Sequence, residues 1–305
     1  MKKIYLSIAA IAIATTIFSY KTGKEKINKE EYIQSVKEWQ QNRLERLKSK
    51  NGWLNLVGLH WLKEGENPFG SNEANNIVFP DKAPEFIGSI LLYKDHLSVR
   101  IEPDVDVYIN DSLAKEHEVY PDAAENTTYF KLGDLRWHII KRGDQYGIRL
   151  RDLKSPLLEQ ITEIPTFPID LKWRLKATFV PFDTPKEIAV PNFLGDVNYE
   201  KCYGSLKFTI DGQELSLMPL GDGVNENFFV IFADETSAEE TYGAGRFLSV
   251  GKPDKNGITY IDFNKATNPP CAFTNYATCP LPPKENILPV KILAGEKTNA
   301  LIGHH

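Results

Sequence analysis

The sequence is poor in the residues from which proteins build metal sites and disulfide scaffolds. It has 3 cysteines in 305 residues, which excludes a disulfide-dense fold. It has 6 histidines, and apart from the two at the C-terminal end they all lie at or before His138. No histidine is near Cys271 and Cys279 in the sequence, so the spacing supports no zinc site. We expect neither a metal nor a cofactor.

The chain also lacks a basic excess, internal repeats and low-complexity tracts. Its formal net charge is −5, and residues 1–21 contribute three lysines and no acidic residue. Nucleic-acid binding normally requires a basic surface, so we expect no nucleic-acid partner. The apolar fraction of 42% and the charged fraction of 25% are those of an ordinary globular protein, long enough for two domains.

Residues 1–21 carry the clearest local pattern. Two lysines precede an uncharged run from Ile4 to Tyr20, as in the n-region and h-region of a secretory signal. The run is also just long enough to span a membrane, and it lacks a strong cleavage site. A cleaved signal ending near Ser19 and a retained anchor both fit. We expect an exported protein, periplasmic or in the cell envelope, or anchored to the inner membrane through its N-terminus.

An amphipathic helix is predicted over residues 28–50. Its apolar residues recur at three- and four-residue steps, among them Tyr32, Val36 and Leu47, and Asn51-Gly52 supplies the end. Short apolar runs separated by turn signals follow, which indicates β structure. The expected fold is mainly β, with two sandwich-like or barrel-like modules behind the helix. The modules are expected at 51–155 and 201–300, joined by a proline-rich connection at 156–200.

The first module contains a pattern similar to the forkhead-associated β-sandwich. Phe69-Gly70, Asn76-Ile77-Val78 and a later Val-x-Ile-Asn strand carry the resemblance. The phosphothreonine site of that family requires an arginine, a serine and a histidine. In this chain Pro84-Glu85-Phe86-Ile87-Gly88 stands where the serine and the histidine would be. The resemblance therefore implies the scaffold without phosphopeptide binding.

A long loop over residues 262–286 is expected to be the functional element of the second module. It contains five prolines and two cysteines, so it can form neither a helix nor a central strand. Its aromatic residues give it apolar surface to bury, which favours an ordered loop.

Cys271 and Cys279 allow three interpretations. An exported protein meets an oxidising compartment, which favours a disulfide between them. They can instead be buried free thiols, or take part in catalysis or metal binding, although no histidine lies near them to act as a base. A disulfide is the expected state.

Arginines are the candidate ligand contacts. Arg246 follows Gly243-Ala244-Gly245 and can present a fork to an anion, or it can pair with Asp262 or Glu285 to brace the loop. Arg149 and Arg151 share one face of a strand, which suits an anion or a solvated edge. Three further candidate ligand contacts are Tyr242, which directly precedes Gly243, and Asn264 and Asn268 of the 262–286 loop.

Carboxylates offer an alternative function. Asp262 and Glu285 flank the loop, and Glu296 follows the last predicted strand. Two carboxylates that face one cleft can serve as general acid and base in a hydrolase. The spacing in sequence does not set their separation in the fold.

Several of these segments resemble the domain-of-unknown-function family 1684. The resemblance is carried by Asn51-Gly52-Trp53-Leu54, Tyr146–Asp152, Thr241–Leu248, the 262–286 loop and Ala294-Gly295-Glu296-Lys297. It spans about residues 40 to 300. It implies no established activity and no catalytic residue.

The expected function is the binding of a small or oligomeric, polar or anionic ligand near Arg246 and the 262–286 loop. The alternative is a hydrolase that uses Asp262, Glu285 or Glu296 as acid and base.

Overall fold

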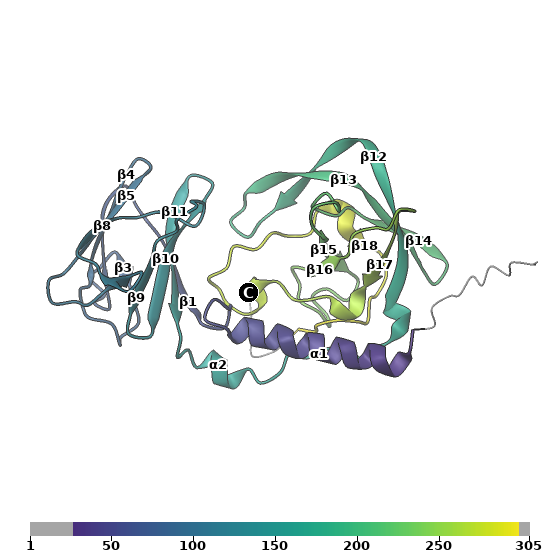
Figure 1. The fold of residues 1–305 in the computed structure, drawn as a ribbon, viewed down its shortest axis with the longest axis horizontal. Helices are drawn as coiled ribbons and strands as arrows, with labels where there is room; N and C mark the ends of the chain where they lie inside the picture. The colour runs from purple at the N-terminus through teal and green to yellow at the C-terminus, as the bar shows by residue number, and fades with distance from the viewer. Residues whose placement is uncertain (1–26, 299–305) are drawn as a thin grey trace, which may run out of the picture.

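The chain forms two β-rich lobes beside an N-terminal helix (Figure 1). The computed structural model describes residues 27–298, so the predicted signal or anchor segment lies outside the described residues. The mainly β fold with a preceding helix is confirmed. Among the helices within residues 27–298, none is long and apolar enough to cross a membrane.

Helix α1 (Lys29–Lys48) packs one apolar face against the second lobe. It begins at Asn28, whose side chain accepts hydrogen bonds from the backbone N–H groups of Glu30 and Glu31. The buried residues Tyr32, Val36, Leu44 and Leu47 form the predicted stripe. Polar contacts fix the helix as well, because the Tyr32 hydroxyl donates to the Asp262 carboxylate at 2.7 Å.

The first lobe is a sandwich of two sheets around one apolar core. The six-stranded sheet has the order β1-β11-β10-β9-β6-β7, and the five-stranded sheet has the order β3-β2-β4-β5-β8. Trp137 lies at the centre of the core, where its ring contacts those of Phe69, Phe79 and Phe130. The strands are β1 (Leu56–Trp61), β2 (Gly65–Gly70), β3 (Ile77–Val78), β4 (Gly88–Tyr93), β5 (His96–Ile101), β6 (Tyr108–Ile109), β7 (Ser112–Leu113), β8 (Glu116–Glu118), β9 (Tyr129–Leu132), β10 (Leu135–Arg142) and β11 (Gln145–Asp152).

The second lobe combines a four-stranded sheet, β14-β13-β12-β17, with a three-stranded sheet, β16-β15-β18. Their shared core contains Phe228, Phe232 and Phe263. The elements are α2 (Leu157–Gln160), η1 (Leu171–Trp173), β12 (Arg174–Pro191), β13 (Val197–Ile210), β14 (Gln213–Leu217), β15 (Phe228–Asp234), β16 (Arg246–Val250), β17 (Ile258–Asp262), η2 (Phe263–Lys265), η3 (Pro270–Ala272), η4 (Lys284–Asn286) and β18 (Ile287–Leu288).

The stretch expected as a proline-rich connection contains the longest strand of the fold. β12 forms a hairpin with β13, and this hairpin arches over the second lobe in Figure 1. The prolines are accommodated because the ladder is irregular between Pro181 and Lys186. The tip of the hairpin holds the 262–286 loop, since the N–H of Leu281 donates to the Pro191 carbonyl at 2.7 Å.

Gly245 is required by a close approach between β16 and its neighbours. Its φ is +82°, and a Cβ placed there would lie 2.5 Å from both the Phe232 carbonyl oxygen and Pro282. The nearby Gly243 is different, because a Cβ there would meet its nearest neighbour, in Ala238, at an ordinary 3.4 Å. The two glycines look equivalent in the sequence, but Gly243 has room for a side chain and Gly245 does not.

Gly245→Ala should lower the free energy of unfolding by at least about 2 kcal/mol, because a left-handed backbone and a steric overlap act together. Gly243→Ala is the matched control and should change it by less than about 0.5 kcal/mol. Urea unfolding of both variants measures the difference. Equal effects would show that the close approach at Gly245 does not constrain the fold.

Candidate functional site

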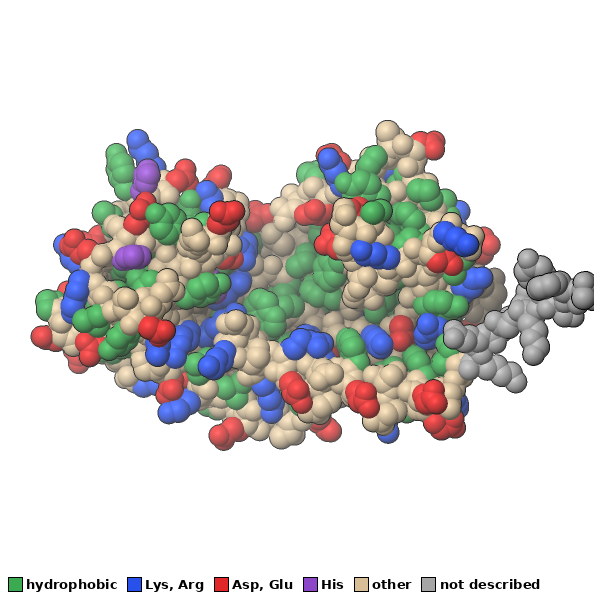
Figure 2. All heavy atoms as spheres, in the orientation of Figure 1, with side chains coloured by type: hydrophobic (Ala, Val, Ile, Leu, Met, Phe, Trp, Pro, Cys, Tyr) green, Lys and Arg blue, Asp and Glu red, His purple; other side chains and the backbone are tan. Residues whose placement is uncertain are grey.

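The outer face of the six-stranded sheet carries a row of cationic side chains. Strand alternation directs Trp137, Ile139 and Ile148 into the sandwich core. The intervening residues point the other way, and the register pairs Arg136 with Arg151 and His138 with Arg149 across β10 and β11. Figure 2 shows a hollow between the two lobes, with Lys and Arg side chains gathered on the wall that the first lobe forms.

Arg149 is the least satisfied cation of this row. It is only 7% exposed. Its side chain makes no hydrogen bond and no ion pair with any residue in 27–298, and its Nε is buried without a partner. The guanidinium carbon lies 5.3 Å from the centre of the Trp53 ring, which covers one side of it. Burial, followed by the charges of Arg142 and Arg151, lowers the pKa of Arg149 to about 10.

The neighbours of Arg149 are already paired. Arg151 donates to the Gly52 carbonyl and, at 2.9 Å, to the side-chain oxygen of Asn55. Arg142 donates to both carboxylate oxygens of Asp122, at 3.1 and 2.9 Å. The only carboxylate that these contacts bring to the row is thus occupied by another arginine. Arg149 remains a buried cation with hydrogen-bond donors to spare.

His138 is a second polar group of the row that sequence reasoning missed. It is buried beside Arg149 and stacks at a tilt against the Tyr129 ring, with 5.3 Å between ring centres. Burial, with the nearby charges of Arg149 and Arg151, lowers the pKa of His138 to about 4. The imidazole is therefore neutral at pH 7 and can donate or accept one hydrogen bond.

A hollow of about 500 Å³ opens beside these groups. His138, Arg136, Arg151, Tyr129 and Asp122 are among the residues that line it. It combines cationic groups with an aromatic wall, and its volume suits a small molecule.

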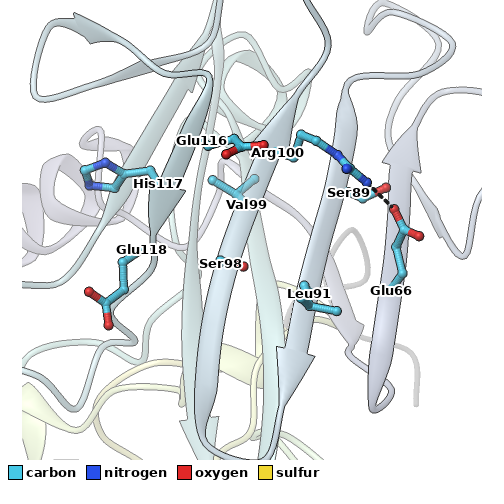
Figure 3. A pocket seen from close by; sticks show the side chains of 9 residues that line it. All are labelled: Glu66, Ser89, Leu91, Ser98, Val99, Arg100, Glu116, His117 and Glu118. Carbon is cyan, nitrogen blue, oxygen red and sulfur yellow. Dashed lines mark hydrogen bonds and ion pairs between the residues drawn. The ribbon is translucent and has the colours of Figure 1, made fainter.

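A larger hollow lies elsewhere, on the outer face of the five-stranded sheet. It has a volume of about 610 Å³, and Figure 3 shows Arg100 reaching across it to Glu66. That pair is exposed, with 3.0 Å between Nη2 and Oε1. Because its arginine is solvated and already paired, this hollow offers an anion much less than the buried row does.

The 262–286 loop is ordered by its contacts with the rest of the chain. Three short 3₁₀ turns, η2, η3 and η4, shape it. The Thr274 hydroxyl donates to the Leu56 carbonyl of the first lobe at 3.3 Å, and Arg43 of α1 lies over the Phe273 ring. The loop therefore packs against the first lobe beside the cationic row.

Cys271 and Cys279 lie against each other inside the loop. The backbone N–H of Cys271 donates to Sγ of Cys279 at 3.1 Å, and the N–H of Cys279 donates to Sγ of Cys271 at 3.3 Å. Both are buried free thiols in this structure, so the disulfide between them stays a prediction. A hydrogen bond from the Cys279 thiol lowers the pKa of Cys271, while the same bond and burial raise that of Cys279.

Tyr242 is buried in the same apolar cluster as the two thiols. Burial raises the pKa of its hydroxyl, and the two cysteines add to the rise. Trp53 packs against this cluster, and the guanidinium carbons of Arg149 and Arg151 lie over its ring. The structure brings these three candidate residues close to one region.

Arg246 occupies a different place from the one expected of a ligand contact. It is 1% exposed and pairs with Asp234, not with Asp262 or Glu285. It also donates to the backbone carbonyls of Ile292 and Ala294. A ligand would have to displace these partners, so Arg246 is suited to holding the C-terminal segment.

No contact joins the three candidate carboxylates to one another within residues 27–298. Asp262 accepts from Tyr32 and Glu296 accepts from Arg43 at 3.2 Å, contacts that lie eleven residues apart on α1. Eleven residues of helix span about 16 Å. Glu285 is exposed. Burial raises the pKa of Glu296, although Arg43 opposes the rise.

The two candidate asparagines, Asn264 and Asn268, make hydrogen bonds that hold the 262–286 loop. Asn264 donates to the Tyr32 hydroxyl and to the Asp170 carbonyl, both at 2.9 Å. The N–H of Asn268 donates to Glu296 at 2.6 Å, and its side-chain amide donates to the Lys297 carbonyl at 2.9 Å. Their amide groups therefore brace the loop. Within the described residues, no group of three or more His, Cys, Asp or Glu side chains could hold a metal ion.

Trp53 and His138 are the residues that sequence reasoning missed. Strand alternation places His138 on the face of Arg149 once β10 and β11 are paired in register. Trp53 lies outside any strand, so only the folded structure places its ring over a guanidinium.

Replacing Arg246 or Arg149 by methionine should have opposite consequences for stability. Arg246→Met leaves Asp234 buried without a partner and should lower the free energy of unfolding by about 3–5 kcal/mol. Arg149→Met removes an uncompensated buried cation and should leave that free energy unchanged or raise it by about 1 kcal/mol. Urea unfolding at pH 7 without added anions makes the comparison. A loss for Arg149→Met as large as that for Arg246→Met would give Arg149 a structural role.

His138 should make the fold sensitive to acid. Between pH 6.5 and about 4 the unfolded chain binds a proton at this histidine while the folded chain does not. Stability is therefore lost as the pH falls through this window, by about 3 kcal/mol in total. His138→Gln should remove that part of the pH dependence. Thermal unfolding of both proteins at several pH values tests this, and parallel curves would contradict it.

Comparisons with known proteins identify a family but point to no activity. No curated protein matches the chain. A solution NMR structure of an uncharacterized protein from Haloarcula marismortui is 29% identical, with 47% of this chain and 80% of that chain covered and a TM-score of 0.39. A structure titled as an analysis of phosphothreonine-dependent FHA domain interactions is 14% identical, with 30% and 92% covered and a TM-score of 0.22. These likenesses support no functional conclusion.

A family model described as "Protein of unknown function (DUF1684)" matches residues 159–297. The match includes Thr241–Leu248, the 262–286 loop and Ala294–Lys297, three of the segments on which the resemblance was based. The other two, Asn51–Leu54 and Tyr146–Asp152, precede it. Residues 159–297 of this chain belong to the DUF1684 family, whose function is unknown.

Proposed function

We propose that the protein binds a small anion between its two lobes and that Arg149 is the group that pairs with it. The observation that carries this proposal is an arginine that is only 7% exposed, whose side chain makes no hydrogen bond or ion pair among the described residues and whose Nε is buried without a partner. Removing a charge from water without a counter-charge costs several kcal/mol. A bound anion would supply the missing counter-charge.

The surroundings of Arg149 favour an anion over a neutral ligand. Arg151 and Arg142 add positive charge, and Asp122, the acidic group nearby, is taken up by Arg142. The burial that weakens the hydration of Arg149 also strengthens its attraction for an anion, because the local dielectric constant is low. A carboxylate, sulfate or phosphate group can accept two parallel hydrogen bonds from one guanidinium.

Arg149 does not itself line the hollow of about 500 Å³. Its cross-strand neighbour His138 does, with Arg136 and Arg151, so the hollow offers room beside Arg149 for the rest of the ligand. His138 is neutral at pH 7, so it can bond to a hydroxyl or carbonyl oxygen without adding charge. Trp53 holds Arg149 in position from one side. The residues 1–21 predict export, so we place this binding outside the cytoplasm, in the cell envelope or at the membrane.

Binding is better supported than hydrolysis. Two carboxylates that act as acid and base on one bond must lie within about 10 Å of each other. The contacts of Asp262 and Glu296 are separated by eleven residues of α1, and each carboxylate already accepts hydrogen bonds that fix the fold.

Isothermal titration calorimetry at pH 7 tests the proposal with two probes, sulfate for tetrahedral dianions and malonate for carboxylates. The wild-type protein should bind one of them, and Arg149→Gln should weaken that binding at least tenfold, equivalent to about 1.4 kcal/mol. Arg100→Gln is the matched control, because Arg100 lies on the other sheet and is paired at the surface. It should leave the affinity unchanged.

The proposal fails if Arg149→Gln binds as tightly as the wild type, or if the wild type binds neither probe and carries no anion when isolated. Native mass spectrometry of the protein from its own host checks the second point. A retained anionic ligand, absent from Arg149→Gln prepared in the same way, would identify the natural ligand.

A further inference from the structure

The thiol pair of the loop and the unpaired arginine of the sheet share one environment. Trp53 packs against the apolar cluster that contains Cys271, Cys279 and Tyr242. The guanidinium carbon of Arg149 lies over the same Trp53 ring, 5.3 Å from the ring centre. A hydrogen bond from the Cys279 thiol lowers the pKa of Cys271, and the positive charge of Arg149 adds to the lowering.

The two thiols are arranged for reaction with each other. Each backbone N–H donates to the sulfur of the other residue, which brings both sulfurs to one point of the loop. The pair is also asymmetric, because Cys271 sheds its proton more easily than a free cysteine and Cys279 holds its proton more firmly. The third cysteine, Cys202, lies in a separate apolar cluster.

We propose that Cys271 and Cys279 are a site of reversible oxidation and that forming their disulfide strengthens anion binding at Arg149. This inference rests on the proposed function. In the reduced protein, ionisation of Cys271 would place a negative charge near Arg149 that competes with an external anion. A disulfide carries no charge, so oxidation leaves Arg149 in need of a counter-ion.

A small hydroperoxide is the class of oxidant that fits the site, since Cys271 is only 3% exposed. The Cys271 thiolate attacks one peroxide oxygen, the O–O bond breaks, and a sulfenic acid forms while the released alkoxide or hydroxide takes a proton. The Cys279 thiol then attacks the Cys271 sulfur, the S–S bond forms and water leaves. In total two thiols and one hydroperoxide give a disulfide, an alcohol or water, and one further water.

The pH dependence of the effect identifies its source. The ionisable groups around Cys271 are Cys279 and Tyr242 in its own cluster and Arg149 on the sheet, while Arg43 of α1 lies over the adjacent Phe273. Neither arginine nor the tyrosine changes charge between pH 6 and 8.5. Cys271 and Cys279 are the groups of this set whose charge can differ between the reduced and oxidised proteins in this range.

The test measures sulfate binding by calorimetry on the full chain, once reduced with dithiothreitol and once oxidised with hydrogen peroxide, at pH 6 and pH 8.5. Sulfate keeps its charge at both values. At pH 8.5 the oxidised protein should bind about fivefold to tenfold more tightly, and at pH 6 the difference should shrink. Cys271→Ser should bind equally after either treatment, and Cys202→Ser should behave as the wild type.

Peptide mass spectrometry tests whether the disulfide forms. Oxidation should join the peptides that contain Cys271 and Cys279 and remove two hydrogen atoms. Failure to join them would overturn the inference and leave the proposed function intact. Equal sulfate affinity of the two forms would overturn the coupling alone. Absence of sulfate and malonate binding in both forms, with the disulfide formed, would instead refute the proposed function and the coupling with it.

Discussion

The ion pair between Arg246 and Asp234 is the contact on which the second lobe depends. It lies wholly inside the protein and ties the start of β16 to the end of β15. Through the carbonyls of Ile292 and Ala294 the same guanidinium holds the C-terminal segment. That segment presents Glu296, which accepts the N–H of Asn268 and so holds the beginning of the 268–281 part of the loop. The position of the thiol pair follows from this series of contacts.

Two buried arginines in one chain show why burial alone does not reveal a role. Arg246 has a carboxylate and two carbonyl oxygens as acceptors, so its charge is compensated by the fold. Arg149 has the face of an indole ring and two like charges nearby. The charge of Arg246 is therefore compensated by groups within the protein. Arg149 has no such acceptor among residues 27–298, which is the physical basis for the proposal that it binds an anion.

The sequence predicts the parts of this arrangement that depend on local pattern. Helix periodicity placed α1 at 28–50, close to the observed Lys29–Lys48, and strand alternation placed Arg149 and Arg151 on one face. The partner of Arg246 could not be predicted, because it depends on how the end of β15 packs against β16. Residues 156–200 were expected as a connection because prolines normally interrupt strands, whereas here an irregular ladder accommodates them in β12. The separation of Asp262 and Glu296 could not be predicted either, because it follows from their contacts with two residues of α1 that lie eleven positions apart.

The anchoring of α1 also determines when the chain can complete its fold. The helix is among the first structured segments to be synthesised, yet its polar partners Asp262, Asn268 and Glu296 are made more than two hundred residues later. At a synthesis rate of about 5–20 residues per second, the apolar face of the helix waits roughly 10–50 s for its cover. Forming these contacts also closes very long loops of the chain, which costs conformational entropy. A nascent chain therefore leaves part of this face uncovered until its last segment has been synthesised.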